Sequence, residues 1–265
     1  MRSSCCAAVF ICFLTQVSPG QQGSSVFLEE LTSVEVGDAI RKGATTVILP
    51  TGGTEQNGPH MALGKHNFIV KYTAEQVALR LGGALAAPAM KYVPEGDVDP
   101  SSGHMRYPGT ISLPNKHFMK VVEFASQSFR AHGFTDIVFL PDSGGNVEGM
   151  RTVARLLNNE WRAEATRIHL ADQYYSDNGF AEWLVGQGET EETIGSHAGL
   201  DTTSELLAVA PEHVRKDKLA AADPAAPLGH SGDPTRASAN YGRAGLELKI
   251  ATAVRQIQLS MEQSR

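Results

Sequence analysis

Cysteine is scarce in this chain of 265 residues, and all three copies, Cys5, Cys6 and Cys12, lie near the amino terminus. If that segment is removed on maturation, no cysteine remains. A mature chain without cysteine forms no disulfide, no cysteine-ligated zinc site and no thiol nucleophile. Its stability must then come from its core, and residues 23–265 are enough to bury a large one.

Long apolar runs are also lacking, so no segment is predicted to cross a bilayer as a helix. Residues 5–14 form an apolar run that follows Arg2 and precedes the small residues around Ser18 and Gly20. A basic residue, about ten apolar residues and a small-residue region are typical of a secretory signal peptide. We predict a signal peptide over residues 1–22, one domain over 23–265, and a periplasmic or secreted protein that does not contact the membrane after cleavage. The alternative is a buried N-terminal strand or helix.

Positive charge is limited, because 23 Lys and Arg residues stand against 29 Asp and Glu residues, for a formal net charge of −6. No block of the sequence concentrates basic residues. Proteins that bind nucleic acid usually carry a basic patch or stripe. Nucleic acid is therefore not an expected partner.

Short β-branched runs alternate with helical patterns along most of the chain. Such alternation is typical of a parallel sheet covered by helices on both faces. We predict an α/β fold, three-layer α/β/α with a mainly parallel sheet. The predicted strands are 45–49, 84–93, 136–140 and 167–171, and the predicted helices are 33–42, 68–81, 116–132, 147–163, 206–214 and 241–261.

Three predicted loops collect carboxylate, imidazole and small polar side chains. Two of them follow strands, and ligands bind at the carboxyl ends of strands in open α/β sheets. Mixed carboxylate and imidazole ligands suit Zn²⁺ or Mn²⁺, and the chain has no Gly-x-Ser-x-Gly motif, so metal-assisted hydrolysis is the simplest enzymatic interpretation. The loops hold Glu55, His60 and His66; Asp142, Ser143 and Asn146; and His197, Asp201 and Glu205.

Each of these residues also has a structural interpretation. A single histidine often serves only as a hydrogen-bonding or capping residue. The segment Gly144-Gly145-Asn146 before a helix fits a tight turn with an N-cap, or an anion site at a helix N-terminus. The clustering in loops after buried strands, rather than any one residue, favours a functional site.

Five segments, in chain order, resemble signature motifs of the creatininase family. The first is similar to the family's Gly-Ser-x-Glu-Gln-His-Gly-Pro-His, and the second to its Phe-Pro-Gly-Thr-x-Ser-Leu. The others resemble the end of its Asn-Gly-His-Gly-Gly-Asn turn, its His-Ala-Gly-x-x-Glu-Thr-Ser, and a Gly-x-x-Gly-Asp-Pro segment. The matching segments are Gly52–His60, Tyr107–Leu113, Gly144–Asn146, His197–Ser204 and Gly229–Pro234.

This resemblance implies a two-metal amidohydrolase in which a bridging hydroxide attacks a carbonyl and a nearby acid protonates the leaving nitrogen. It implies a small cyclic or linear amide as substrate, creatinine or a related compound, and a homo-oligomer, in the family often a hexamer. It also implies that glycine-lined turns bring backbone close to the ligand. On this basis, we expect substrate contacts from Asn57, Tyr107, Ser143, Gly144 and Gly145.

The chain departs from the family at several metal-ligand positions. Glu55 matches the ligand Glu. The positions of the family's other ligands are occupied by Asn57, His66, Ser143, Gly145 and Thr202. A neutral imidazole has one free lone pair, so His66 cannot bridge two ions as the family's Asp does.

Two hypotheses follow from these departures. In the first, the protein is a metal-dependent amidohydrolase with one Zn²⁺ or Mn²⁺ ion rather than two. The metal ligands would be Glu55, His66 and Asp142, and the acid/base or supporting residues would be His60, His104 and His197. In the second, the metal is lost and the protein is a non-catalytic, exported small-molecule-binding protein on the same fold.

Overall fold

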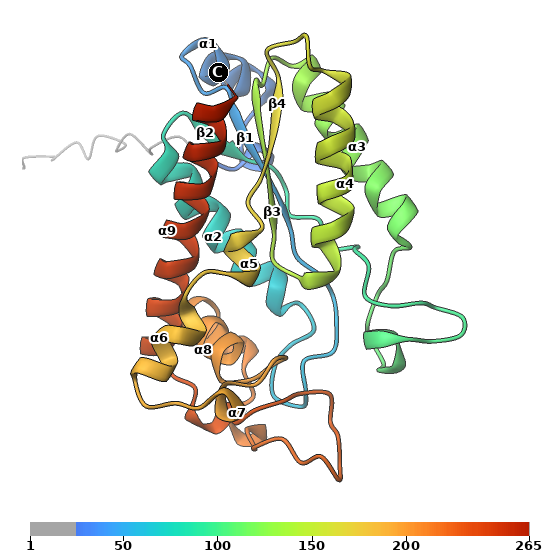
Figure 1. Cartoon of the computed structure of the whole chain (residues 1–265), viewed down its shortest axis with the longest axis vertical. Coiled ribbons are helices and arrows are strands. Elements are labelled where there is room, and N and C mark those ends of the chain that lie inside the picture. Colours follow the sequence, from blue (N-terminus) through green and yellow to red (C-terminus); the bar gives the residue numbers. More distant parts are fainter. Residues whose placement is uncertain (1–24, 265) are drawn as a thin grey trace, which may run out of the picture.

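Four parallel strands form the centre of the molecule in a computed structural model that describes residues 25–264 (Figure 1). The strand order is β2-β1-β3-β4, and every neighbouring pair is parallel. All six residues of β1 are buried, as expected for a strand covered on both faces. The strands are β1 (Thr46–Thr51), β2 (Ala84–Ala86), β3 (Asp136–Pro141) and β4 (Arg167–Leu170).

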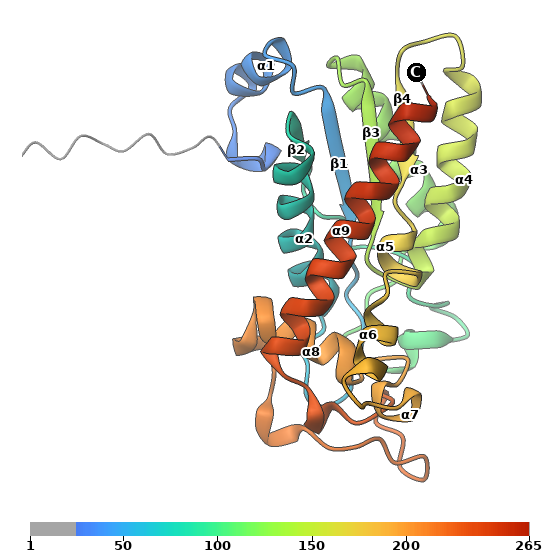
Figure 2. The ribbon, with the colours of Figure 1, turned by 60° about the vertical axis from the view of Figure 1, so that its left-hand side comes forward.

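Helices cover both faces of this sheet, so the predicted three-layer α/β/α fold is confirmed (Figure 2). Side chains alternate along a strand, and Val47 and Leu49 of β1 therefore enter one core while Ile48 enters the other. Residues of α2 (Lys65–Leu81), α5 (Gln173–Ser176) and α9 (Ala239–Gln263) pack with Ile48. Residues of α1 (Ser33–Arg41), α3 (Asn115–Ala131) and α4 (Gly144–Glu160) pack on the opposite face.

Shorter helices gather around the end of the sheet where the strands finish (Figure 1). These are α6 (Phe180–Gly186), α7 (Glu191–Ile194) and α8 (Leu200–Val209). Five 3₁₀ helices complete the described chain: η1 (Leu28–Glu30), η2 (Gly103–Arg106), η3 (Pro211–His213), η4 (Lys216–Lys218) and η5 (Pro234–Arg236). Within residues 25–264, no helix combines the length and the apolar character needed to span a membrane.

Two predicted elements differ from the structure. The strand predicted over 84–93 ends at Ala86, because Pro88 has no N–H to donate to a ladder; further on, Met90 and Val93 form only isolated bridges. The helix predicted over 206–214 begins earlier, at Leu200, and ends at Val209 before Pro211 starts a 3₁₀ turn. The predicted signal peptide lies outside the described residues.

The register between β1 and β3 fixes the position of the two principal loops. Thr51 lies opposite Pro141, so both strands end at the same edge. The Asp142 N–H donates to the Thr51 carbonyl at 2.9 Å. The loop that carries Glu55 and the start of α4 are therefore neighbours, as the sequence predicted.

Candidate active site

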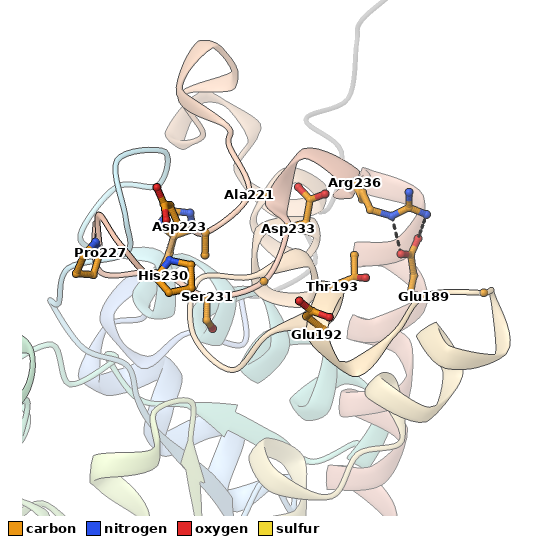
Figure 3. A pocket seen from close by; sticks show the side chains of 14 residues that line it. Glu189, Glu192, Thr193, Ala221, Asp223, Pro227, His230, Ser231, Asp233 and Arg236 are labelled. Atoms are coloured by element: carbon orange, nitrogen blue, oxygen red, sulfur yellow. Dashed lines mark hydrogen bonds and ion pairs between the residues drawn. The ribbon is translucent and has the colours of Figure 1, made fainter.

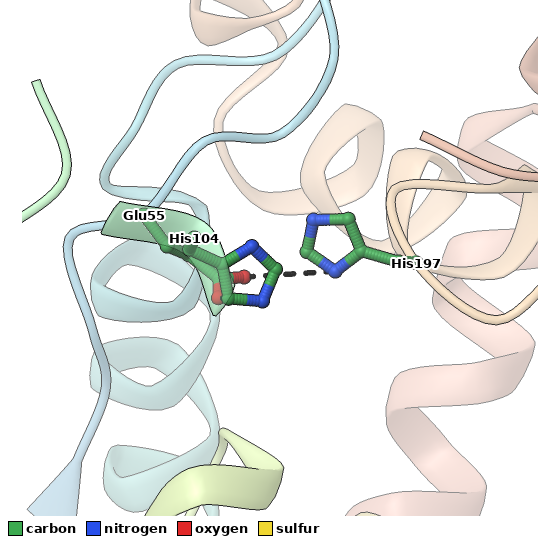
Figure 4. A group of neighbouring side chains, drawn as sticks. All are labelled: Glu55, His104 and His197. Carbon is green, nitrogen blue, oxygen red and sulfur yellow. Dashed lines mark ion pairs between the residues drawn. The ribbon is translucent and has the colours of Figure 1, made fainter. Parts of the chain in front are cut away.

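Glu55 is the centre of a buried group of charged and imidazole side chains (Figure 4). The residue is 2% exposed. Its Oε1 lies 2.9 Å from His66 Nε2, 3.3 Å from Lys65 Nζ and 3.8 Å from His197 Nδ1. Its Oε2 lies 3.1 Å from His104 Nε2. The β1 loop, the start of α2, η2 and the α7–α8 connection thus converge on one carboxylate.

The charges in this group are set by burial and by Lys65. Burial works to raise the pKa of Glu55, but the Lys65 ammonium and His66 outweigh it and hold that pKa well below its usual range. Burial lowers the pKa of His197 to about 4 and also lowers the pKa of His104. At neutral pH the site therefore presents an ionised carboxylate beside two neutral imidazoles.

These three side chains fit a divalent metal ion. One ligand atom from each of Glu55, His104 and His197 lies within 4.8 Å of the others. His197 Nε2 is 2.9 Å from the Gln56 carbonyl oxygen, to which it donates, and this leaves the Nδ1 lone pair toward Glu55. The Gln56 side-chain amide lies 3.0 Å from His104 Nδ1 and orients that ring as well. One carboxylate and two imidazoles are a ligand set suited to Zn²⁺ or Mn²⁺.

His66 connects Glu55 with the second strand-end carboxylate. Its Nε2 faces Glu55 at 2.9 Å and its Nδ1 faces Asp142 Oδ2 at 3.0 Å. The two ring nitrogens point in different directions, so an ion bound to one of them lies away from the other's partner. The structure thus arranges the three predicted ligands in a row rather than around one point.

A buried polar network contacts Asp142 at Oδ1, the oxygen that does not face His66. Lys249 Nζ on α9 lies 3.0 Å from Asp142 Oδ1 and 3.1 Å from Glu205 Oε2 on α8, and the Tyr174 hydroxyl donates to Asp142 at 2.7 Å. Burial works to raise the pKa of Asp142, yet Lys249 and His66 bring it down to about 2. Asp142 is therefore a fixed, ionised carboxylate whose Oδ2 lies 3.0 Å from His66 Nδ1.

A pocket of about 520 Å³ opens onto this group. Its lining includes six of the predicted site residues besides His197, namely Glu55, His66, His104, Ser143 and the pair Gly144-Gly145. A second pocket, of about 750 Å³, is lined by none of the predicted site residues (Figure 3). Its wall contains the Glu189–Arg236 ion pair, 2.7 Å long. The chemistry is therefore concentrated in the smaller pocket.

Glu95 is a member of the smaller pocket that the sequence analysis did not single out. It is 4% exposed, and its Oε1 has no hydrogen-bond partner among the described residues. Burial and the negative charge of Glu55 raise the pKa of Glu95 to about 10. A Cβ at Gly53 would overlap the Glu95 carboxyl, so that glycine leaves room for it. Glu95 is thus a protonated carboxylic acid beside an ionised one.

Besides Asp142, three other predicted site residues lie outside the lining of this pocket. The Asn57 amide, fully buried, donates to the carbonyls of Glu55 and Ala62 and shapes the β1 loop. Tyr107 closes η2, where its N–H bonds the His104 carbonyl. His60 Nε2 lies 3.1 Å from both the Ala198 carbonyl and Thr203 Oγ1. Their predicted roles in catalysis or substrate binding stay predictions.

His60 should make the folded protein sensitive to acid. Its Nε2 donates to Ala198 while the buried Nδ1 has no partner, and burial lowers the pKa of His60 to about 4. Because the folded pKa is below the unfolded one, the stabilisation is present above about pH 6.5 and is lost as the pH falls toward 4. Between pH 7.5 and pH 5, this residue should cost about 2 kcal/mol of unfolding free energy. Urea unfolding of wild type and of His60→Gln at both pH values measures this cost. If the two proteins lost the same unfolding free energy between pH 7.5 and pH 5, His60 would not be its source.

Comparison with known proteins identifies the family of this chain. The family model described as creatinine amidohydrolase matches residues 29–257. The chain belongs to the creatininase family. Membership of the creatininase family, which the five motifs predicted, is therefore confirmed.

Relatives within the creatininase family carry different activities in their names. The mycofactocin precursor peptide peptidase of Mycobacterium ulcerans (strain Agy99) is 30% identical over 217 residues, which are 75% of this chain and 78% of the relative. The creatinine amidohydrolase of Pseudomonas putida is 28% identical over 206 residues, which are 76% of this chain and 78% of the relative. A solved structure named Creatininase Mn has a TM-score of 0.75 at 24% identity, covering 90% of this chain and 99% of that one, and shows the shared fold.

Three of the five positions where this creatininase-family chain is predicted to depart from the motifs line the pocket, namely His66, Ser143 and Gly145. Ser143 and Gly145 stand at the start of α4, where the resemblance placed an imidazole and an acid. His66 stands between two carboxylates. The two histidines nearest Glu55, besides His66, come from segments far along the chain, His104 and His197.

Proposed function

We propose that this protein is a metal-dependent amidohydrolase that cleaves a C–N bond of a small cyclic or linear amide, with one Zn²⁺ or Mn²⁺ ion held by Glu55, His104 and His197. The observation that carries the proposal is the convergence of one carboxylate and two neutral imidazoles at the pocket. The names of the relatives support a C–N bond, since peptide and creatinine hydrolysis both break one.

The residues around the ion have separable tasks in this proposal. A bound Zn²⁺ or Mn²⁺ would acidify a water molecule and polarise the substrate carbonyl. The row Asp142–His66–Glu55 fixes the orientation of the Glu55 carboxylate. Glu95 holds a proton on its carboxyl group at neutral pH and can deliver it to the leaving nitrogen.

The proposal includes an exported, oligomeric protein. The location rests on the signal-peptide pattern of residues 1–22, and the oligomer rests on the family resemblance. Size-exclusion chromatography with light scattering measures the oligomer, and cell fractionation of the full chain measures the location.

Metal analysis distinguishes the ligand set found in the structure from the row that includes Asp142. We expect stoichiometric Zn²⁺ or Mn²⁺ in the purified protein by elemental analysis. His104→Gln should lower metal affinity by about 100-fold, the size expected when a ligand or a residue supporting one is lost, while His66→Gln should lower it by about tenfold or less. If His66→Gln lowered metal affinity more than His104→Gln, the ion would be assigned to His66 instead.

The same proteins test the non-catalytic alternative. The metal-loaded protein should hydrolyse members of a panel of lactams, peptides and linear amides, and chelation should abolish turnover. If the protein has no metal and cannot be reconstituted with either ion, but still binds members of the panel, it is a binding protein and the hydrolase proposal fails.

A further inference from the structure

The N-terminus of α4 forms one wall of the pocket and has unused hydrogen-bond donors. Ser143 is the N-cap residue, but its side chain makes no capping hydrogen bond. The Gly145 N–H has no acceptor among residues 25–264, and both glycines of the first turn line the pocket. Free N–H groups and the helix dipole make such an end attractive to negative charge.

Two hydroxyl groups add to these donors, and this second observation points to a ligand. Ser143 is 4% exposed, its hydroxyl has no hydrogen-bond partner in the described part of the chain, and its remaining surface faces the pocket. The Tyr175 hydroxyl bonds the Gly144 backbone at the same wall. Tyr175 is 36% exposed, and its phenol keeps its proton at neutral pH, so this hydroxyl remains a donor.

The nearby charges permit an anion at this wall. The ammonium of Lys65 lies against Glu55, and that of Lys249 lies against Asp142, so each of these two buried carboxylates already has a cation beside it. The pairing of Glu55 with Lys65 and of Asp142 with Lys249 therefore leaves the α4 donors open to a further anion.

We propose that Ser143, Gly145 and Tyr175 form a subsite for a carboxylate group of the substrate. This proposal rests on the proposed function and narrows its substrate class. One imidazole, His66, separates Glu55 from Asp142, which immediately precedes Ser143. The carboxylate would therefore lie close to the reacting amide, as in an N-acylated amino acid or at the carboxyl end of a peptide.

The test compares Ser143→Asp with Ser143→Asn in the metal-loaded protein. Asp and Asn are both favourable N-cap residues, so both variants should keep α4 and the melting temperature. They are nearly the same size, but only Asp brings a negative charge to the subsite. The probes are N-acetylglycine and its uncharged counterpart N-acetylglycinamide, with dissociation constants measured by ligand-observed NMR.

We expect the wild type to bind N-acetylglycine at least about tenfold more tightly than the amide, which is about 1.4 kcal/mol. Ser143→Asn should stay within about threefold of wild type for the acid, and Ser143→Asp should lose at least about tenfold for the acid alone. Tyr175→Phe removes one donor, and its affinity for N-acetylglycine should lie between those of Ser143→Asn and Ser143→Asp.

Two results would overturn the subsite. If Ser143→Asp binds N-acetylglycine like wild type and chelation abolishes binding, the carboxylate sits on the metal; the subsite then fails while the proposed metal site stands. If Ser143→Asp lowers kcat with no change in binding of either probe, the serine contacts charge in the transition state rather than a carboxylate. Conversely, a charge-dependent loss in a protein that takes up no metal supports the subsite and removes the proposed hydrolase.

Discussion

Glu55→Gln should remove metal binding and lower kcat/KM by at least about 10³-fold, which corresponds to about 4 kcal/mol of transition-state stabilisation. Gln has the shape of Glu but no charge, and Glu55 is the group on which Lys65, His104 and His197 converge. The measurements are metal content by elemental analysis and steady-state kinetics on an amide that the wild type hydrolyses.

The same substitution leaves a buried ammonium without its carboxylate. Lys65 is 1% exposed and lies 3.3 Å from Glu55, and breaking a buried pair in this way typically costs about 3–5 kcal/mol. Adding Lys65→Met to Glu55→Gln should restore most of this stability but neither metal binding nor activity. Glu247→Gln, on an exposed ion pair with Arg80, is the matched control and should change neither property. A double variant that recovers activity would show that Glu55 acts only in folding.

Lys249→Met should be the most destabilising single substitution in the network behind the site. It removes the cation shared by Asp142 and Glu205, which are 1% and 3% exposed, and leaves two buried carboxylates facing each other. We expect a loss of about 3–5 kcal/mol in unfolding free energy near pH 8. Urea unfolding measures the loss, and exposed Lys120→Met, paired with Glu123, is the control with an expected change below about 0.5 kcal/mol.

The pH dependence of the unfolding free energy shows whether Glu205 and Asp142 cause the loss of stability in Lys249→Met. Burial raises the pKa of Glu205 to about 7, against the lowering effect of Lys249. Because this folded pKa is above the unfolded one, the stability linked to Glu205 is present at low pH and is lost as the pH rises through about 7. Asp142, with its pKa lowered to about 2, behaves in the opposite way and keeps its contribution above about pH 4.

The defect of Lys249→Met should therefore be smaller at pH 5 than at pH 8, because Glu205 can take up a proton at the lower pH. Adding Glu205→Gln should recover part of the loss at pH 8 and little at pH 5. A defect that is equal at both pH values would mean that Lys249 stabilises the fold through packing of its alkyl chain rather than through its charge.

The sequence identified most members of the site but not their grouping. Glu55, His66 and Asp142 follow strands that end at one edge, and a parallel sheet brings such loops together, so their proximity was predictable. The direction in which each ring nitrogen of His66 points was not, because it depends on the placement of α2 against β3. His104 and His197 come from η2 and the α7–α8 connection, whose shapes have no periodic signal in the sequence.

The buried charged residues were the hardest to predict from the sequence. A lysine normally faces solvent, and only the packing of α2 and α9 shows that Lys65 and Lys249 are both buried against carboxylates. Glu95 lies in a long loop, and its protonation exists only because that loop folds onto Glu55.

By itself, the sequence determined the family, the α/β fold and the loop that carries Glu55, because motif spacing and apolar runs are local properties. It also predicted that the family's two-metal ligand set is altered. The tertiary structure decided which histidines surround Glu55. It also placed a cation beside Glu55 and another beside Asp142, and it left the donors of α4 open to the pocket. Burial and distance set the charge of a side chain, and both arise only when segments remote in sequence pack together.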